Sequence, residues 1–212
     1  MNDILKFVTN LRIEPSMIFP VLAFLIFWRF PQLLCVQWWK LCVKELSYRK
    51  ALLANPHDVK TLENLGDILY GTKRFTQAED AYRKALKIDP TSAQAHFELA
   101  CLLCDTKRDK EAEIPLLEAI KCDANFINPY IKLGLLLMNL QRYGEAENIF
   151  RRAIEREPNE PLLYSGLAIT LEKQKRFDEA INVYERAIKL NPTDATIYNH
   201  YVSIITTSCA LM

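Results

Sequence analysis

The stretch LENLGDILYGTKRFTQAEDAYRKALKIDP, residues 62–90, decides the fold, because its pattern returns at residues 130–158 as YIKLGLLLMNLQRYGEAENIFRRAIEREP. Both stretches begin with a large apolar residue, continue through Leu-Gly and end at a proline. The pattern fills four consecutive units of 34 residues between positions 57 and 192. An internal repeat of this length indicates an array of stacked supersecondary units.

Several columns of residues keep this 34-residue interval. Apolar residues recur at helical spacing in two runs per unit, which predicts two helices in each. A small residue follows the first leucine of every unit, so that the two helices can approach closely, and a proline near the unit's end stops the second helix. The columns are Leu65, Leu99, Leu133 and Leu167; Gly66, Ala100, Gly134 and Ala168; Ala78, Ala112, Ala146 and Ala180; and Ala85, Ala119, Ala153 and Ala187.

These units resemble the tetratricopeptide repeat (TPR). The resemblance covers about residues 57–205, and the second unit departs most from the pattern, with His96, Asp109 and Ala124 at motif positions and Pro115 inside its second helix. It implies an all-α fold, namely a TPR solenoid of about four and a half helix-turn-helix repeats, which we expect to be preceded by an apolar, transmembrane helix. The first unit carries the motif as Leu62, Leu65-Gly66, Leu69, Ala78, Tyr82, Ala85 and Pro90.

Four regions follow from this reading. Residues 1–40 form an N-terminal segment with a candidate membrane anchor at 17–39. Residues 41–56 match the second helix of a repeat whose first helix is missing, residues 57–192 hold the four repeats, and residues 193–212 form a capping helix and tail. A terminal helix of this kind covers the last apolar face of an array.

The anchor candidate contains 12 consecutive uncharged residues, Met17 to Trp28. With its continuation to residue 39 it is long enough to span a bilayer, which needs about 20 apolar residues, although Arg29 interrupts it. More basic residues follow the segment than precede it, which predicts a single-pass protein with its repeats in the cytoplasm. A cleaved signal peptide and a soluble cap buried on protein are the alternatives. The expected anchor residues are Phe19, Leu22, Phe24, Leu25, Ile26, Phe27 and Trp28.

Composition and motifs favour binding over catalysis. The net charge is only +1, whereas nucleic-acid binding favours a surplus of basic residues. The chain has no nucleophile elbow, phosphate loop or zinc-protease motif, so we expect no catalytic residue, no metal site, no cofactor and no nucleic-acid partner. Cys101 and Cys104 form a C-x-x-C in mid-helix, which we interpret as packing, and the terminal Cys209-Ala-Leu-Met matches a prenylation pattern that we interpret as coincidence.

The TPR resemblance implies a binding site on the concave face, which is built from the first helix of each unit. An apolar middle of this groove suits an amphipathic helix or an apolar peptide of another protein. Glu63 and Asp67 at one end would repel an acidic tail and favour a basic feature on the ligand. The predicted groove residues are Glu63, Asp67, Tyr70, Phe97, Cys101, Ile131, Leu135, Met138, Ile169 and Glu172.

Two functions fit these features. The preferred one is a non-catalytic scaffold or assembly factor, tethered to the lipid bilayer, that binds partner proteins in the groove. The alternative is a structural subunit of a larger complex or homo-oligomer, whose apolar N-terminus is buried on protein.

Overall fold

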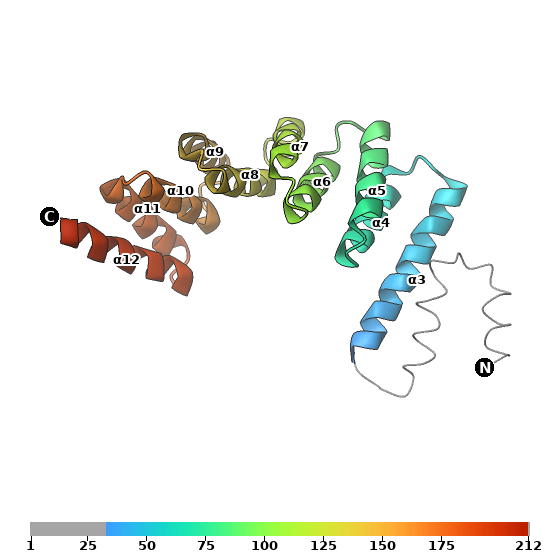
Figure 1. Ribbon diagram of the computed structural model, residues 1–212, viewed down its shortest axis with the longest axis horizontal. Coiled ribbons are helices and arrows are strands. Elements are labelled where there is room, and N and C mark those ends of the chain that lie inside the picture. The colour runs from blue at the N-terminus through green and yellow to red at the C-terminus, as the bar shows by residue number, and fades with distance from the viewer. Residues whose placement is uncertain (1–32, 212) are drawn as a thin grey trace.

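The computed structural model describes residues 33–211, with side chains over 40–206, and contains ten α-helices in this range. Figure 1 shows the helices following one another from α3 at one end of the array to α12 at the other. The predicted all-α stack of helices is confirmed. The helices are α3 Leu33–Ala54, α4 Val59–Gly71, α5 Phe75–Ile88, α6 Ala93–Asp105, α7 Asp109–Cys122, α8 Ile127–Asn139, α9 Tyr143–Arg156, α10 Pro161–Lys173, α11 Phe177–Leu190 and α12 Ala195–Leu211.

The helices pair as α4 with α5, α6 with α7, α8 with α9 and α10 with α11, and each second helix also contacts the first helix of the next pair. The first helices contact one another directly, α4 with α6, α6 with α8, and α8 with α10. One large core therefore runs along the array, with a smaller cluster of Leu62, Ala85 and Ala95 near its start, and the alanine and leucine columns are buried. Helix α7 continues through Pro115 without a break.

The small-residue column is needed because an aromatic ring lies directly against it. A Cβ atom added at Gly66 would lie 2.4 Å from the Tyr82 ring, and one at Gly134 would lie 2.4 Å from the Phe150 ring. Tyr82 and Phe150 are themselves fully buried. The prediction that small residues permit close helix approach is confirmed, and Gly166, outside that column, meets Phe150 in the same way.

Every first helix of a pair ends in the same tight turn. The residue after the C-cap adopts φ between 60° and 64°, at Lys73, Lys107, Gln141 and Lys175. In α4 the backbone N–H of Arg74 donates to the Leu69 carbonyl oxygen and that of Lys73 to the Tyr70 carbonyl oxygen. This is the Schellman arrangement, which usually employs glycine at the left-handed position.

A ladder of arginine–glutamate pairs joins consecutive pairs of helices. The arginine that precedes each second helix donates from Nη1 to a glutamate 29 residues earlier, on the second helix of the preceding pair, over 2.6 to 2.8 Å. The pairs are Arg74–Glu45, Arg108–Glu79, Arg142–Glu113 and Arg176–Glu147. Ile181 stands where the next glutamate of the series would fall, so the ladder ends with the fourth pair.

Helix α3 packs as the second helix of a pair would, and no first helix precedes it within the described residues. It contacts α4, and its Glu45, only 3 % exposed, receives Arg74 through the first step of the ladder. The helix begins at Leu33 and therefore extends across the predicted boundary between residues 40 and 41, because no glycine or proline interrupts residues 33–54.

Most of the predicted membrane segment, including every expected anchor residue from Phe19 to Trp28, lies outside the described residues. Within residues 33–211, no helix has the length and apolarity needed to cross a membrane. At the other end, α12 contacts α11 and α10 and buries Ile197 and Ile204, as expected for a terminal capping helix.

Candidate protein-interaction groove

The ten predicted groove residues lie on α4, α6, α8 and α10, the four helices that contact one another in sequence along the inner side of the pairs. Each helix presents the same three columns, which fall at the fifth, ninth and twelfth positions of the unit. Spacings of three and four residues place such columns on one helix face. The structure therefore brings the predicted residues into one strip that crosses four helices, in which Glu63 is buried.

The C-terminal half of this strip is apolar. Leu135 of α8 is 43 % exposed, and Ile131, Met138 and Ile169 are half-buried and pack against the core. Phe97 of α6 extends the apolar floor, with its ring edge-on to Phe126 at a centroid distance of 5.2 Å. An exposed leucine on the same strip as half-buried apolar side chains is a favourable contact for an apolar side chain of a ligand.

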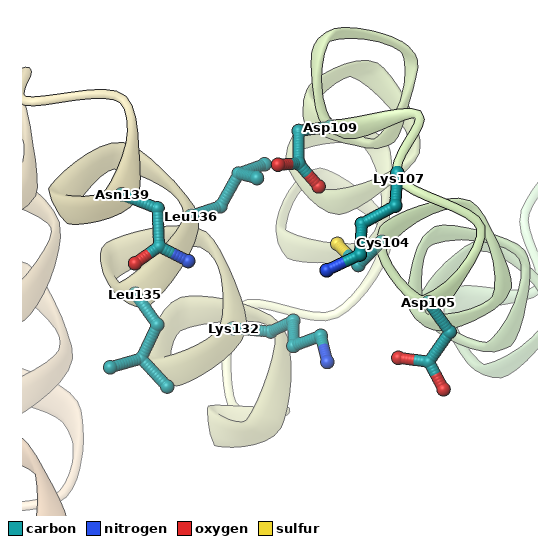
Figure 2. A pocket seen from close by; sticks show the side chains of 8 residues that line it. All are labelled: Cys104, Asp105, Lys107, Asp109, Lys132, Leu135, Leu136 and Asn139. Carbon is teal, nitrogen blue, oxygen red and sulfur yellow. The ribbon is translucent and has the colours of Figure 1, made fainter.

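A hollow of about 280 Å³ opens beside Leu135 between α6 and α8. Figure 2 shows Lys132 extending from α8 toward α6, where Cys104 and Asp105 form the opposite wall. The hollow thus gives a polar border to the apolar floor. Its lining consists of Cys104, Asp105, Lys107, Asp109, Lys132, Leu135, Leu136 and Asn139.

Glu63 departs from the expectation of an open groove contact. Its side chain is buried, with a residue exposure of 5 %. Ser92 Oγ donates to its carboxylate at 2.5 Å and Lys60 Nζ at 3.1 Å. Glu63 therefore links α4 to the start of α6, and its charge is compensated within the protein.

Tyrosines hold the other acidic side chains of the strip. Tyr82 Oη donates to Asp67 Oδ1 at 2.9 Å, and Tyr184 Oη donates to Glu172 Oε2 at 3.2 Å. Tyr70, itself a predicted groove residue, donates from Oη to Asp105 Oδ2 at 2.5 Å and so connects α4 to α6. Neutral donors orient these carboxylates but leave their negative charge uncompensated.

At the α4–α6 end of the strip, two carboxylates have raised pKa values. Loss of hydration in the concave surroundings raises the pKa of Asp67, and the hydrogen bond from Tyr82 lowers it only in part. Burial and then the charge of Asp67 raise the pKa of Glu98 on α6. Both carboxylates are therefore less stable in their charged form than in water, and a nearby cation would stabilise them.

The C-x-x-C thiols are half-buried on α6, and Cys104 lies in the last turn of this helix and not in mid-helix as expected. Burial raises the pKa of Cys101 to about 12 and also raises the pKa of Cys104, while Lys132 lowers both only in part. Such thiols stay protonated near neutral pH and are poor nucleophiles. Cys101 therefore contributes to the groove as a small apolar side chain.

The sequence interpretation missed Glu98 and Lys132. Both occupy the sixth position of their unit, which the family's groove positions do not include. Their helical spacing would have revealed them, because the sixth position lies three residues before the ninth and borders the same face.

Family comparisons agree with this architecture. Tetratricopeptide-repeat models match residues 59–92, 81–114 and 131–195, which together cover more than half of the chain. No curated protein matches the chain at a significant level.

Three solved structures illustrate the fold. MamA is 24 % identical with a TM-score of 0.66, and the match covers 72 % of this chain and 89 % of MamA. YrrB, described as a TPR protein with an unusual peptide-binding site, is 20 % identical with a TM-score of 0.65, over 76 % of this chain and 83 % of YrrB. The pilF protein of Pseudomonas aeruginosa is 23 % identical with a TM-score of 0.66, over 76 % and 74 %.

At these identities the similarity establishes the fold alone. The repeat models, the helix pairing and the stacked core lead to the same conclusion: this chain is a tetratricopeptide-repeat protein.

Proposed function

We propose that this chain is a non-catalytic protein-interaction scaffold or assembly factor, which captures a helical or apolar segment of a partner along the strip on α4, α6, α8 and α10. The TPR family and the peptide-binding neighbour YrrB support a protein-binding role in general. The observation that carries the groove proposal is the exposed Leu135 of α8, which shares the strip with the half-buried apolar side chains of Ile131, Met138 and Ile169.

The groove proposal is tested by Leu135→Asp against Leu117→Asp. Leu117 lies on the second helix α7 and is 44 % exposed, against 43 % for Leu135, so both substitutions place a charge at equally exposed leucines. We expect Leu135→Asp to abolish partner co-purification while the helical circular dichroism stays unchanged. Leu117→Asp is expected to retain the partner. Wild-type capture by Leu135→Asp would contradict the concave-face site.

The same proposal places the protein at a membrane through residues 17–39, as a single-pass protein with its repeats in the cytoplasm. It is supported by the uncharged run from Met17 to Trp28 and by the basic residues that follow it. Alkaline carbonate extraction tests this tether. The full chain is expected to stay with the membrane, and a chain lacking residues 1–39 is expected to be released.

A structural subunit is the second candidate function, and α3 supplies the observation that favours it. Three apolar side chains of α3, Val43, Leu46 and Leu53, are 48 %, 55 % and 85 % exposed, on a helix without a first-helix partner among the described residues. A larger complex or a homo-oligomer would cover them. Release of the full chain by carbonate together with a high sedimenting mass would favour this role over the tethered scaffold.

A further inference from the structure

The strip on the first helices has a charge polarity. Helices α4 and α6 together carry four acidic residues, Glu63, Asp67, Glu98 and Asp105, against one basic residue, Lys60. Helix α8 carries only Lys132, and the two charges of α10, Glu172 and Lys173, cancel. The strip therefore begins acidic at α4 and α6 and becomes apolar at α8 and α10.

Part of this acidity is uncompensated. Among the described residues, Lys60 pairs with Glu63, but no lysine or arginine forms an ion pair with Asp67, Glu98 or Asp105. Asp67 and Asp105 receive tyrosine hydroxyls, and Glu98 receives the Gln94 side-chain amide at 2.6 Å. Each carboxylate is therefore held in place by a neutral donor and keeps its negative charge toward the groove.

These features select one occupant for the groove. We infer that it binds a partner protein's segment with basic residues at one end and an apolar face along the rest, the basic end lying over α4 and α6 and the apolar face over α8 and α10. This inference rests on the proposed function and specifies the chemistry of its ligand. Charge complementarity makes an acidic ligand unfavourable, because it would meet the carboxylates of Asp67 and Glu98, neither of which forms an ion pair within the described residues.

The length of the segment follows from the helix spacing. Neighbouring packed helices lie about 10 Å apart, so the path from α4 to α10 is roughly 30 Å. A helix rises 1.5 Å per residue, so a helical ligand of about 20 residues would cross the strip.

Two synthetic peptides provide the probe. Both are amphipathic helices of about 20 residues with leucines along one face. One carries arginines in its terminal turn, and the other carries glutamates at the same positions. Fluorescence anisotropy with the full-length chain in detergent micelles is expected to show about tenfold tighter binding of the arginine peptide at low ionic strength.

Variants that remove the negative charges of α4 and α6 test whether this end causes the preference for the arginine peptide. Asp67→Asn with Glu98→Gln keeps the hydrogen-bond acceptors and should reduce the preference to within about twofold, because only the charge is lost. The matched control is Glu155→Gln with Asp178→Asn, two exposed acids on the outer helices α9 and α11, which should keep the full preference. Glu98→Lys raises the net charge of this end by the same two units as the double variant, so it should reduce the preference to a similar extent.

The outcomes separate this inference from the proposed function. Equal binding of both peptides, lost in Leu135→Asp, would leave the groove in place and overturn the basic end. Binding that Leu135→Asp does not weaken would contradict the groove itself. Failure of both peptides to bind a chain that sediments as a dimer would assign the strip to a second copy and also overturn the inference.

Discussion

Gly134 illustrates how single positions decide the distance between helices. It lies on α8, and the buried Phe150 ring of α9 occupies the space where a Cβ atom would stand. Gly144, at the start of α9, has no atom within 4 Å of its Cβ position. Packing against Phe150 thus requires a glycine at position 134, whereas no neighbouring atom constrains position 144.

Gly134→Ala is therefore expected to destabilise the protein by about 1–3 kcal/mol, since overpacking forces the fully buried ring or the helix to shift. Chemical unfolding followed by circular dichroism measures this change. Gly144→Ala is the control, and it should leave the stability unchanged or raise it by about 0.5 kcal/mol through helix propensity. Equal stabilities of the two variants would contradict the packing role of Gly134.

The role of a residue could be predicted from the sequence where one physical requirement explains why its type repeats every 34 residues. Small residues beside buried rings and alanines between helices repeat because packing leaves no alternative, so Gly66 and Ala78 were predictable. Prediction was less successful for polar side chains, whose exposure depends on neighbours from other helices. Glu63 occupies a groove column but is buried and accepts hydrogen bonds from Ser92 and Lys60, whereas Glu98 lies outside the expected columns and borders the strip.

At the scale of elements, the arginine–glutamate ladder ties each second helix to the next pair. Its glutamates fall at the same 34-residue interval as the alanines, and its first member, Glu45, brings α3 into the array. Arg49 Nε also donates to Glu45, at 2.9 Å. Glu45 is nearly inaccessible to water and is the acceptor that both arginines share, so its removal takes a charge-assisted hydrogen bond from each of them.

Glu45→Ala is accordingly expected to loosen α3 at a cost of about 1–2 kcal/mol, while the helices from α6 onward stay intact. Hydrogen exchange resolved by mass spectrometry would show loss of amide protection in α3. Glu118→Ala removes an exposed bridge to Lys121 on α7 and should leave protection unchanged. Uniform loss of protection along the chain after Glu45→Ala would contradict a local role for this pair.

The ladder also predicts a pH dependence. Burial by itself would raise the pKa of Glu79 and of Glu147, but hydrogen bonds from Arg108 and Arg83 to Glu79, and from Arg151, Gln174 and Arg176 to Glu147, hold both below the ordinary value of 4.5. A carboxylate with a lowered pKa in the folded state stabilises the protein above its unfolded pKa. This stabilisation is lost as the pH falls through the folded value.

The melting temperature should therefore fall as the pH is lowered below about 4.5. The variant Glu79→Gln with Glu147→Gln should melt lower than wild type at pH 7, and its further decline in acid should be shallower. The raised pKa values of Asp67 and Glu98 act in the opposite sense, but they are common to both proteins and cancel in the comparison. Parallel pH profiles for the variant and wild type would show that the ladder glutamates do not contribute.

The helices themselves were largely predictable from the sequence, and their connections were not. Apolar periodicity and the prolines gave two helices in each unit. The four residues with positive φ could not be predicted, because none of them is a glycine. They are Lys73, Lys107, Gln141 and Lys175. The repeat motif at residues 41–56 likewise gave no bound for α3, Leu33–Ala54, since a motif marks where helices pack and not where they begin.

At the scale of the whole molecule, α4, α6, α8 and α10 lie next to one another. The residues at the fifth, ninth and twelfth positions of each unit therefore form one strip, which is acidic at α4 and α6 and apolar at α8 and α10. Helix α12 covers the last pair, and the arginine–glutamate ladder stops before it. Helix α12 thus covers α10 and α11, and α3 presents exposed apolar side chains at the other end of the described helices. The strip and α3 are accordingly the two surfaces on which we expect partners.

Site-specific photo-crosslinking tests the central claim most directly. A photoreactive amino acid is placed at position 135 on α8 or at position 117 on α7 of the full-length chain, in its native membrane or extract, at leucines of nearly equal exposure. The concave site predicts a discrete adduct from position 135 that position 117 does not form. Adducts of equal yield from both positions, or from position 117 alone, would contradict it.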